Sequence, residues 1–160
     1  MTGFQWSKRS SEKLSKVDGR LVSVVNLALA RSPFDLTIIE GLRSQSTQLA
    51  YFKAKKSKTL HSRHLASGIT GLSNAIDIGV FENGRINWTN VNRYNQLAAL
   101  MFGAADELRV LIRWGADWNQ NGYITDEKFL DFVHYELPAP HNIQAAIDGV
   151  KRRANQRTPQ

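Results

Sequence analysis

The chain contains no cysteine among its 160 residues, and only four prolines and two methionines. Without cysteine there can be no disulfide and no thiolate ligand, so a transition-metal site must use histidine and carboxylate side chains. The same absence leaves the compartment open, because a protein without thiols works in reducing or oxidising surroundings. No apolar run reaches the roughly 18 residues that a membrane-spanning helix requires.

The first nine residues lack the apolar stretch of a secretory signal, although they carry Lys8 and Arg9. Acidic residues are in the minority, and the net charge of the chain is +7. Such a surplus suits a polyanionic partner, which could be nucleic acid, anionic lipid or the acidic polymers of a bacterial envelope. An ordinary basic surface is the alternative, and charge alone does not choose among these readings.

The length and the 42% hydrophobic content predict one domain with a real core. Apolar periodicity predicts helices over residues 11–30, 46–56, 90–112 and 142–155. Short apolar stretches predict strands over 34–39, 75–81 and 133–137, and Asn83-Gly84 predicts a hairpin turn. The expected fold class is α+β, a small, mostly antiparallel sheet covered by helices. We expect one domain over 1–160, with its core at about 10–137 and a basic C-terminal helix at about 141–155.

Two histidines and an aspartate have the chemistry of a zinc site: His64, Asp77 and His134. These side chains can hold Zn²⁺ as three protein ligands and leave the fourth position open to water. Asp131, three residues before the second histidine, could take a proton from that water. A strand over 133–137 turns His134 and Glu136 to the same face, where a carboxylate can fix the imidazole tautomer. The pattern indicates a metal hydrolase with its zinc site on the sheet.

Four short motifs, in this order, resemble the D-alanyl-D-alanine carboxypeptidase type of zinc peptidase. They are Gly41-x-Arg43-Ser44, Ser62-x-His64, Ala75-x-Asp77 and Asp131-x-x-His134-x-Glu136-Leu137. The stretch Arg113-Trp114-Gly115-Ala116-Asp117-Trp118-Asn119 particularly resembles the phage L-alanyl-D-glutamate endopeptidases of that family. The resemblance covers about residues 10–137.

The resemblance implies a role for each residue around the three zinc ligands. Asp131 would be the general base and later the acid toward the leaving amine, with Glu136 as the second candidate for the base. Arg43 would stabilise the oxyanion or position a substrate carboxylate, and a structural salt bridge is the alternative. Ser62 would hydrogen-bond the substrate or the surroundings of the metal.

The spacing between the first two ligands departs from the family pattern. The family usually places the aspartate seven residues after the histidine, whereas Asp77 follows His64 by thirteen, so six residues are inserted. We expect the insertion to bulge out of the small polar loop at 66–74, because doubling a loop's length costs only about 0.6 kcal/mol. The bulge would then line the cleft. His61 is the reserve ligand, although it lacks the Ser-x-His frame.

Residues 117–128 follow the pattern of an EF-hand calcium loop at several positions. The candidate ligands are Asp117, Asn119, Asn121, Tyr123 and Glu127. The last position should be Glu and is Lys128, and no helix pair of EF-hand type flanks the loop. An ordinary turn rich in Asn and Gly is therefore the alternative. A Ca²⁺ ion here would order the route to Asp131 and His134.

The expected function is a phage-type endolysin, a zinc endopeptidase that cuts the peptide stems of peptidoglycan at the L-alanyl-D-glutamate bond. One alternative is a D-alanyl-D-alanine carboxypeptidase or dipeptidase. The other is a non-catalytic basic module that binds the wall or nucleic acid, although the sequence has no RNA-binding or helix-turn-helix signature.

The expected setting follows from the same reading. Without a signal peptide, the enzyme would be made in the host cytoplasm and reach the wall in the periplasm after the membrane is permeabilised. We expect a monomer with peptidoglycan as its partner and no nucleic acid. The basic cluster Lys151, Arg152 and Arg153 adds a possible attraction to an anionic envelope surface.

Overall fold

The structure is a computed structural model that describes residues 3–157. The helices are α1 (Lys8–Leu14), α2 (Gly19–Arg31), α3 (Gln45–Lys53), α4 (Val91–Leu108) and α5 (Ile143–Arg157), with a 3-10 turn, η1 (Pro140–Asn142), before the last. The strands are β1 (Asp35–Glu40), β2 (Ala75–Glu82), β3 (Arg85–Ile86), β4 (Arg113–Trp114) and β5 (His134–Glu136). None of the described helices has the length and apolarity needed to cross a membrane. Residues 1–2 and 158–160, which the domain prediction includes, lie outside the described part of the chain.

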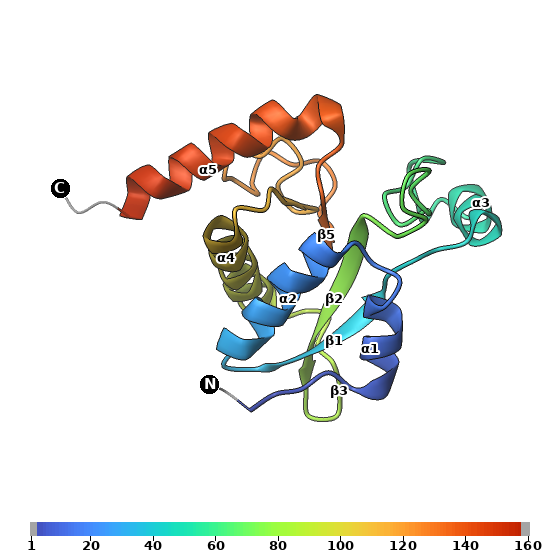
Figure 1. Cartoon of the computed structure of the whole chain (residues 1–160), viewed down its shortest axis with the longest axis horizontal. Helices are drawn as coiled ribbons and strands as arrows, with labels where there is room; N and C mark the ends of the chain where they lie inside the picture. Colours follow the sequence, from blue (N-terminus) through green and yellow to red (C-terminus); the bar gives the residue numbers. More distant parts are fainter. Residues whose placement is uncertain (1–2, 158–160) are drawn as a thin grey trace.

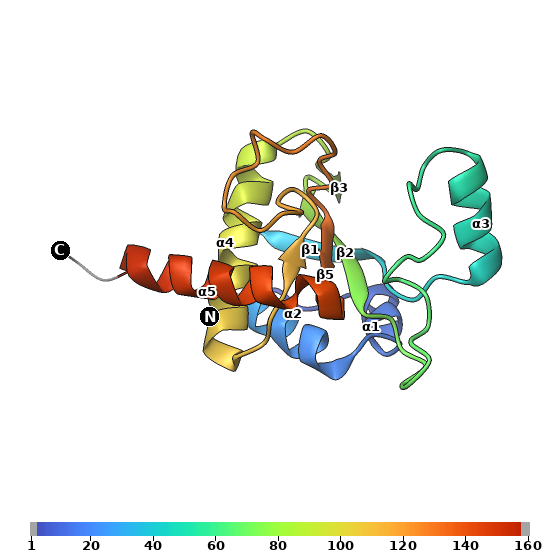
Figure 2. The same ribbon diagram turned by 90° about the horizontal axis from the view of Figure 1, so that it is seen from above.

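The strands form one antiparallel sheet in the order β1-β2-β5-β4, and β3 pairs with the far end of β2. Helices α2 and α4 pack together over one face of this sheet. Helix α3 and the loop after it stand apart from these two helices (Figures 1 and 2). The α+β prediction, with a small antiparallel sheet covered by helices, is confirmed.

Alternation along β2 and β5 separates the core from the opposite face of the sheet. Ile76 and Ile78 are fully buried in the core, and Asp77 between them turns to the other face. On β5, Tyr135 enters the core and stacks on the Trp114 ring at 6.3 Å between centroids. The residues on either side of Tyr135 therefore point to the same face as Asp77.

The helix predicted over 11–30 is in fact two helices, α1 and α2. The chain breaks after Leu14 because Asp18 caps α2, where its Oδ1 accepts the N–H of Arg20 at 3.0 Å. The residue before this cap, Val17, forms a β-bridge with Ser73, far away in the sequence. The apolar periodicity continues through the break, so periodicity alone could not reveal it.

The other local predictions are confirmed with small shifts. Strands 34–39 and 75–81 appear as β1 and β2. Asn83 and Gly84 have φ angles of 53° and 77°, as a two-residue hairpin turn requires. The helix predicted over 90–112 ends at Leu108, because Arg109 adopts the left-handed conformation with a φ of 56°. Strand β4 was not predicted, since two residues carry no periodicity.

Two cations of the C-terminal basic cluster hold α5 against the rest of the fold. Arg153 forms an ion pair with Asp106 on α4 at 2.8 Å and lies 4.4 Å from the centroid of the Phe102 ring. Arg152 donates a hydrogen bond to the backbone carbonyl of Gln120. Lys151 is exposed, whereas Arg152 and Arg153 are half-buried, so the charge available to an envelope surface is smaller than the sequence suggests.

Gly115 allows β4 to lie directly against the turn that leads into β5. Its N–H donates to the carbonyl of His134 at 2.9 Å, and its carbonyl accepts the N–H of Asp131 at 2.8 Å. A Cβ at this position would lie 2.5 Å from the carbonyl oxygen of Asp131 and 3.0 Å from the Cβ of His134. The backbone cannot keep these hydrogen bonds and accept a side chain at position 115.

We therefore expect Gly115→Ala to lower the free energy of unfolding by roughly 1–3 kcal/mol, as overpacking in tight sites does. Denaturant unfolding of the purified variant measures this. Gly68→Ala is the matched control, because a Cβ at Gly68 meets nothing within 4 Å. Equal unfolding midpoints for the two variants would contradict the steric role of Gly115.

Candidate metal centre

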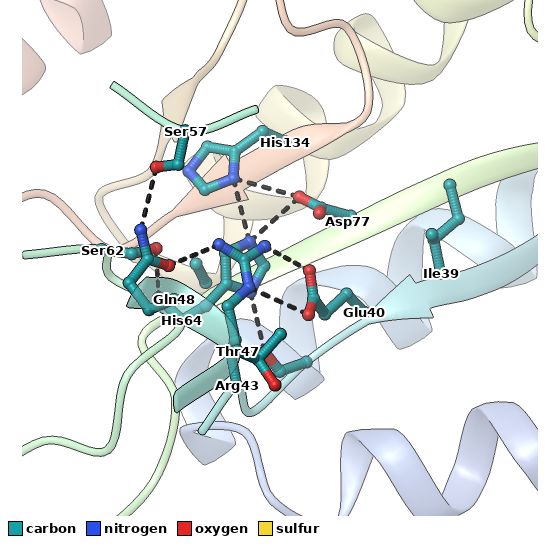
Figure 3. A network of polar contacts seen from close by, with 12 residues as sticks. Ile39, Glu40, Arg43, Thr47, Gln48, Ser57, Ser62, His64, Asp77 and His134 are labelled. Atoms are coloured by element: carbon teal, nitrogen blue, oxygen red, sulfur yellow. Dashed lines mark hydrogen bonds and ion pairs between the residues drawn. The ribbon is translucent and has the colours of Figure 1, made fainter. Parts of the chain in front are cut away.

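Three potential ligand atoms converge on the face of the sheet opposite the core (Figure 3). Asp77 Oδ1 lies 3.1 Å from His64 Nε2 and 3.1 Å from His134 Nδ1. The two imidazole nitrogens are 3.2 Å apart. In a tetrahedral site with metal–ligand bonds of about 2.0–2.1 Å, ligand atoms lie about 3.3 Å from one another. The three side chains thus have the spacing of a mononuclear metal site.

Each ligand is placed by backbone structure. Asp77 and His134 are directly opposite each other in the pairing of β2 with β5. His64 comes from the loop after α3, where its carbonyl accepts the N–H of Arg43 at 2.9 Å. Its own N–H donates to Ser62 Oγ at 3.2 Å. Two ligands are therefore set by the sheet and the third by a local turn.

Hydrogen bonds on the far side of each imidazole orient the ring for metal binding. His64 Nδ1 lies 2.7 Å from the carbonyl of Gly41, which can only accept, so Nδ1 carries the proton and Nε2 presents its lone pair. His134 Nε2 lies 2.8 Å from Glu136 Oε2, which leaves Nδ1 to face the cluster. Such partners fix the tautomer of metal-binding histidines. The prediction that His134 and Glu136 share a face is confirmed.

The electrostatics favour a positive charge at the cluster. Burial alone would lower the pKa of His134, but its hydrogen bonds to Asp77 and Glu136 outweigh burial and raise that pKa to about 9. Burial would raise the pKa of Asp77, but its hydrogen bonds to His134 and His64 lower it instead. The pKa of Glu136 is also lowered, because contacts with His134 and Arg113 oppose the effect of burial. The carboxylates are ionised and attract a cation.

Asp131 borders the same cavity as the three ligands. Burial raises the pKa of its carboxyl group, and the negative charge of Asp77 raises it further. Glu136, the second candidate for the base, is occupied by Arg113 at 2.7 Å and by the outer nitrogen of His134. Asp131 is thus the more available of the two carboxylates.

Arg43 takes part in the salt bridge that the sequence offered as an alternative role. Its Nε donates to Glu40 Oε1 at 2.9 Å, and Nη2 donates to the other carboxylate oxygen. Nη1 donates to Gln48 Oε1 at 2.7 Å (Figure 3). The guanidinium also lies 4.8 Å from the centroid of the Tyr51 ring and lines the cavity.

Glu40 and Gln48 belong to the site, although no motif in the sequence predicted them. Glu40 lies three residues before Arg43, a spacing that could have suggested an ion pair. Gln48 is buried on α3 and donates to the carbonyl of Thr59 at 2.6 Å, which ties the helix to the next loop. No local signal in the sequence indicated this second contact.

The structure brings His64 into the cluster and leaves the reserve ligand His61 exposed outside it. The insertion before Asp77 forms a closed loop, with a bridge between Ala66 and Ser73. The expected bulge is confirmed, but the expectation that it lines the cleft is wrong. The described residues around the cluster cavity include none of 66–74, and the loop borders a separate hollow beside Arg20 and Arg109. The bridge turns the inserted residues away from the cluster.

The cluster lies in a cavity of about 720 Å³, within the range typical of ligand sites. One wall comes from α3 and the following loop, through Tyr51, Lys56 and Lys58. The other comes from the segment before β5, through Trp118 and Phe129. The space is large enough for a short peptide.

The predicted calcium loop is closed by hydrogen bonds among its own residues. Asp117 accepts the backbone N–H groups of Asn121 and Gly122 at 3.0 and 2.9 Å. Asp126 Oδ2 accepts from the side-chain amides of Asn119 and Asn121 at 3.0 and 2.6 Å.

Glu127 and Tyr123, the other two candidate calcium ligands discussed for this loop, differ in their contacts. Glu127 accepts the N–H of Asn119 at 3.0 Å, whereas Tyr123 has an exposed side chain. Among the described residues, the acidic side chains of this loop do not form a group of three that converges as His64, Asp77 and His134 do.

Comparisons with known proteins agree on one family. Residues 2–138 match the family described as phage L-alanyl-D-glutamate peptidase. The chain is 34% identical over 124 residues to the L-alanyl-D-glutamate peptidase of Escherichia phage T5, across 78% of this chain and 88% of that protein. Its fold is similar to the crystal structure of the Serratia marcescens L-Ala D-Glu endopeptidase ChiX, with a TM-score of 0.69 and 31% identity. That similarity covers 85% of this chain and 92% of the other.

Proposed function

Because the chain belongs to the phage L-alanyl-D-glutamate peptidase family, we propose that it is a zinc-dependent endolysin that hydrolyses the L-alanyl-D-glutamate bond of peptidoglycan stems. The observation that carries this proposal is the cluster of His64, Asp77 and His134 on the floor of an open cavity. The comparisons favour this bond over the D-alanyl-D-alanine bond of the wider resemblance. They also favour an enzyme over a binding module.

The donor set supports zinc as the metal. Two imidazole nitrogens and one carboxylate oxygen form a three-ligand set of the kind that catalytic zinc sites use with an open fourth position. When bound, zinc lowers the pKa of a coordinated water and polarises the scissile carbonyl. Glu136 and the carbonyl of Gly41 hold the two imidazoles in the orientation that this chemistry needs.

The remaining roles fall to residues that line the cavity. Asp131 removes a proton from the attacking water and returns it to the leaving amine. Arg43 faces the developing oxyanion or a substrate carboxylate, because its contacts with Glu40 and Gln48 use only three of its five N–H groups. Ser62 Oγ accepts the backbone N–H of His64, and this contact favours a structural role for Ser62 over direct contact with the substrate.

The proposal places the action of this enzyme at the cell wall, where its substrate is. It would be made in the host cytoplasm and reach the periplasm after the membrane is permeabilised. We propose a monomer that binds peptidoglycan and no nucleic acid. Lys151 would supply any attraction of the C-terminal helix to an anionic envelope surface, since Arg152 and Arg153 hold that helix in place.

Digestion of purified peptidoglycan tests the function. Mass analysis of the fragments should show new N-terminal D-glutamate, and released D-alanine would instead indicate the carboxypeptidase alternative. Chelation should abolish the products and added zinc should restore them, because zinc polarises the bond. Full activity in a metal-free preparation would contradict the mechanism.

Ligand variants complete this test. His64→Ala, Asp77→Ala and His134→Ala should each lose zinc, because a three-ligand site cannot spare a ligand. His61→Ala is the matched control and should keep zinc, since His61 lies outside the cluster. If His61→Ala lost zinc while His64→Ala kept it, the ligand would be His61 instead of His64.

A separate variant distinguishes the base from the ligands. Asp131→Asn should keep zinc and the unfolding temperature but lower turnover by about 10²–10⁴, the usual contribution of a general acid–base group. Zinc content and single-substrate kinetics measure the two effects. Asp148→Asn, exposed on α5, is the control. Near-normal turnover in Asp131→Asn would transfer the role to Glu136.

We also propose that the 117–128 loop binds Ca²⁺ weakly, roughly in the 10⁻⁴–10⁻³ M class. Its support is the convergence of Asp117, Asp126 and Glu127 on the same two asparagines. Asp126, which the sequence offered beside Thr125 and Glu127 for the remaining ligand, accepts from the side-chain amides of both asparagines. The loop also contains Trp118, whose ring lies 5.5 Å from that of His134, so ordering the loop would steady a zinc ligand.

Titration of the zinc-loaded enzyme with Ca²⁺ should raise its activity and change its tryptophan fluorescence. Asp117→Ala should abolish both responses, because Asp117 accepts two backbone N–H groups at the start of the loop. Asp148→Ala, outside the loop, should leave both intact. A flat titration of the parent enzyme would reduce this segment to an ordinary turn.

A further inference from the structure

The wall of the cavity that follows α3 carries positive charge that none of the described carboxylates neutralises. Lys56 and Lys58 both line the cavity, and neither forms an ion pair with any residue that the structure describes. Figure 2 shows that α3 and the loop after it, which holds both lysines, stand to one side of the sheet. The two ammonium groups are therefore available to a ligand in the cavity.

Each arginine of the same cavity already has a protein partner, and Arg43 uses three of its five N–H groups in this way. Arg43 is paired with Glu40, and Arg113 is paired with Glu136 at 2.7 Å. Arg63 donates twice to the carbonyl of Leu137, at 3.2 and 3.0 Å. An anionic group of the substrate would thus find the two lysines less committed than any of the three arginines.

Aromatic rings position the two ammonium groups. Lys58 Nζ lies 4.5 Å from the centroid of the Phe129 ring, which stacks at 6.4 Å on Trp118. Trp118 in turn packs on His134, so a continuous series of ring contacts connects Lys58 to a ligand of the metal centre.

Lys56 is held less closely, with its Nζ 5.9 Å from the ring of Tyr51. Arg43 also lies near this ring, 4.8 Å from its centroid. A ring attracts a cation without neutralising its charge, so both lysines keep the ability to bind an anion.

The proposed substrate supplies an anion next to the scissile bond. In peptidoglycan stems the chain continues through the γ-carboxyl of D-glutamate, so the α-carboxylate is free on the carbon bonded to the scissile nitrogen. We propose that Lys56 and Lys58 bind the free carboxylates of the stem, this one above all. The enzyme then prefers stems with an ionised glutamate α-carboxyl over stems in which it is an amide. This inference rests on the proposed function and adds its substrate specificity.

Two synthetic stem peptides, identical except for an α-carboxylate or an α-carboxamide on D-glutamate, provide the test. The parent enzyme should cleave the amide with a kcat/KM lower by about tenfold, the low end for a hydrogen bond to a charged group. The loss should lie mainly in KM. In the double variant Lys56→Met/Lys58→Met, the kcat/KM for the carboxylate peptide should fall to within about twofold of that for the carboxamide peptide. The reason is that only the carboxylate peptide gains from the ammonium groups.

Matched variants separate recognition from general charge and from structure. Lys53→Met removes the same charge from an exposed position at the end of α3, outside the cavity lining, and should keep the preference. Lys58→Arg should keep it as well, since the charge remains. Binding of both peptides to Asp131→Asn, measured by calorimetry, gives the same comparison without turnover.

Three results would overturn the inference. One is equal cleavage of acid and amide by the parent, and another is an unchanged acid preference in the double variant. A third is the loss of preference in Lys53→Met, which would show long-range charge instead of contact. Failure of the proposed function looks different, because the zinc-loaded parent would then cleave the L-alanyl bond of neither peptide.

Discussion

The pairing of β2 with β5 is the constraint on which the site depends. This register sets Asp77 opposite His134 on one face and Ile76 opposite Tyr135 on the other. A slip by one residue would send His134 into the core and Tyr135 into the cavity, because side chains alternate along a strand. Burial of Ile76 and Tyr135 therefore secures the metal ligands, and the core and the site are two consequences of one alignment.

The charges behind the metal centre form a connected series instead of isolated pairs. Arg113 holds Glu136, Glu136 holds the outer nitrogen of His134, and the inner nitrogen of that ring faces Asp77. Buried ion pairs contribute little net stability, because desolvation offsets their attraction. Their value here is geometric, since every link restricts the orientation of the next. The same logic applies to Arg43, which Glu40 and Gln48 hold from two sides.

The parts of the fold that were predictable from the sequence are those with local signals. A short apolar stretch marked β2, and Asn83-Gly84 marked its turn, because both signals depend on adjacent residues. The break at Val17 depends on a bridge to Ser73, and two-residue β4 depends on β5, so neither has a signature of its own.

The site shows the same division. The three candidate ligands were identified through motif order, despite the insertion. Gln48 was missed because its contacts with Arg43 and Thr59 exist only after α3 folds against the next loop.

The two walls of the cavity differ in what holds them, and this difference bears on specificity. The wall around β5 is continuous with the hydrophobic core through Trp114 and Phe132. Among the described residues, the core cluster contains nothing between Ile38 and Ile76, so α3 and the loop after it lie outside it. Polar contacts, such as that of Gln48 with Thr59, hold this wall in place. A wall outside the core can change its charges and its loop length at little cost to the fold, whereas the ligands on the sheet cannot move. The unpaired lysines lie in this wall, whereas the six inserted residues turn away from the cavity. The lysines are therefore where a fixed hydrolytic centre can acquire a preference among substrates.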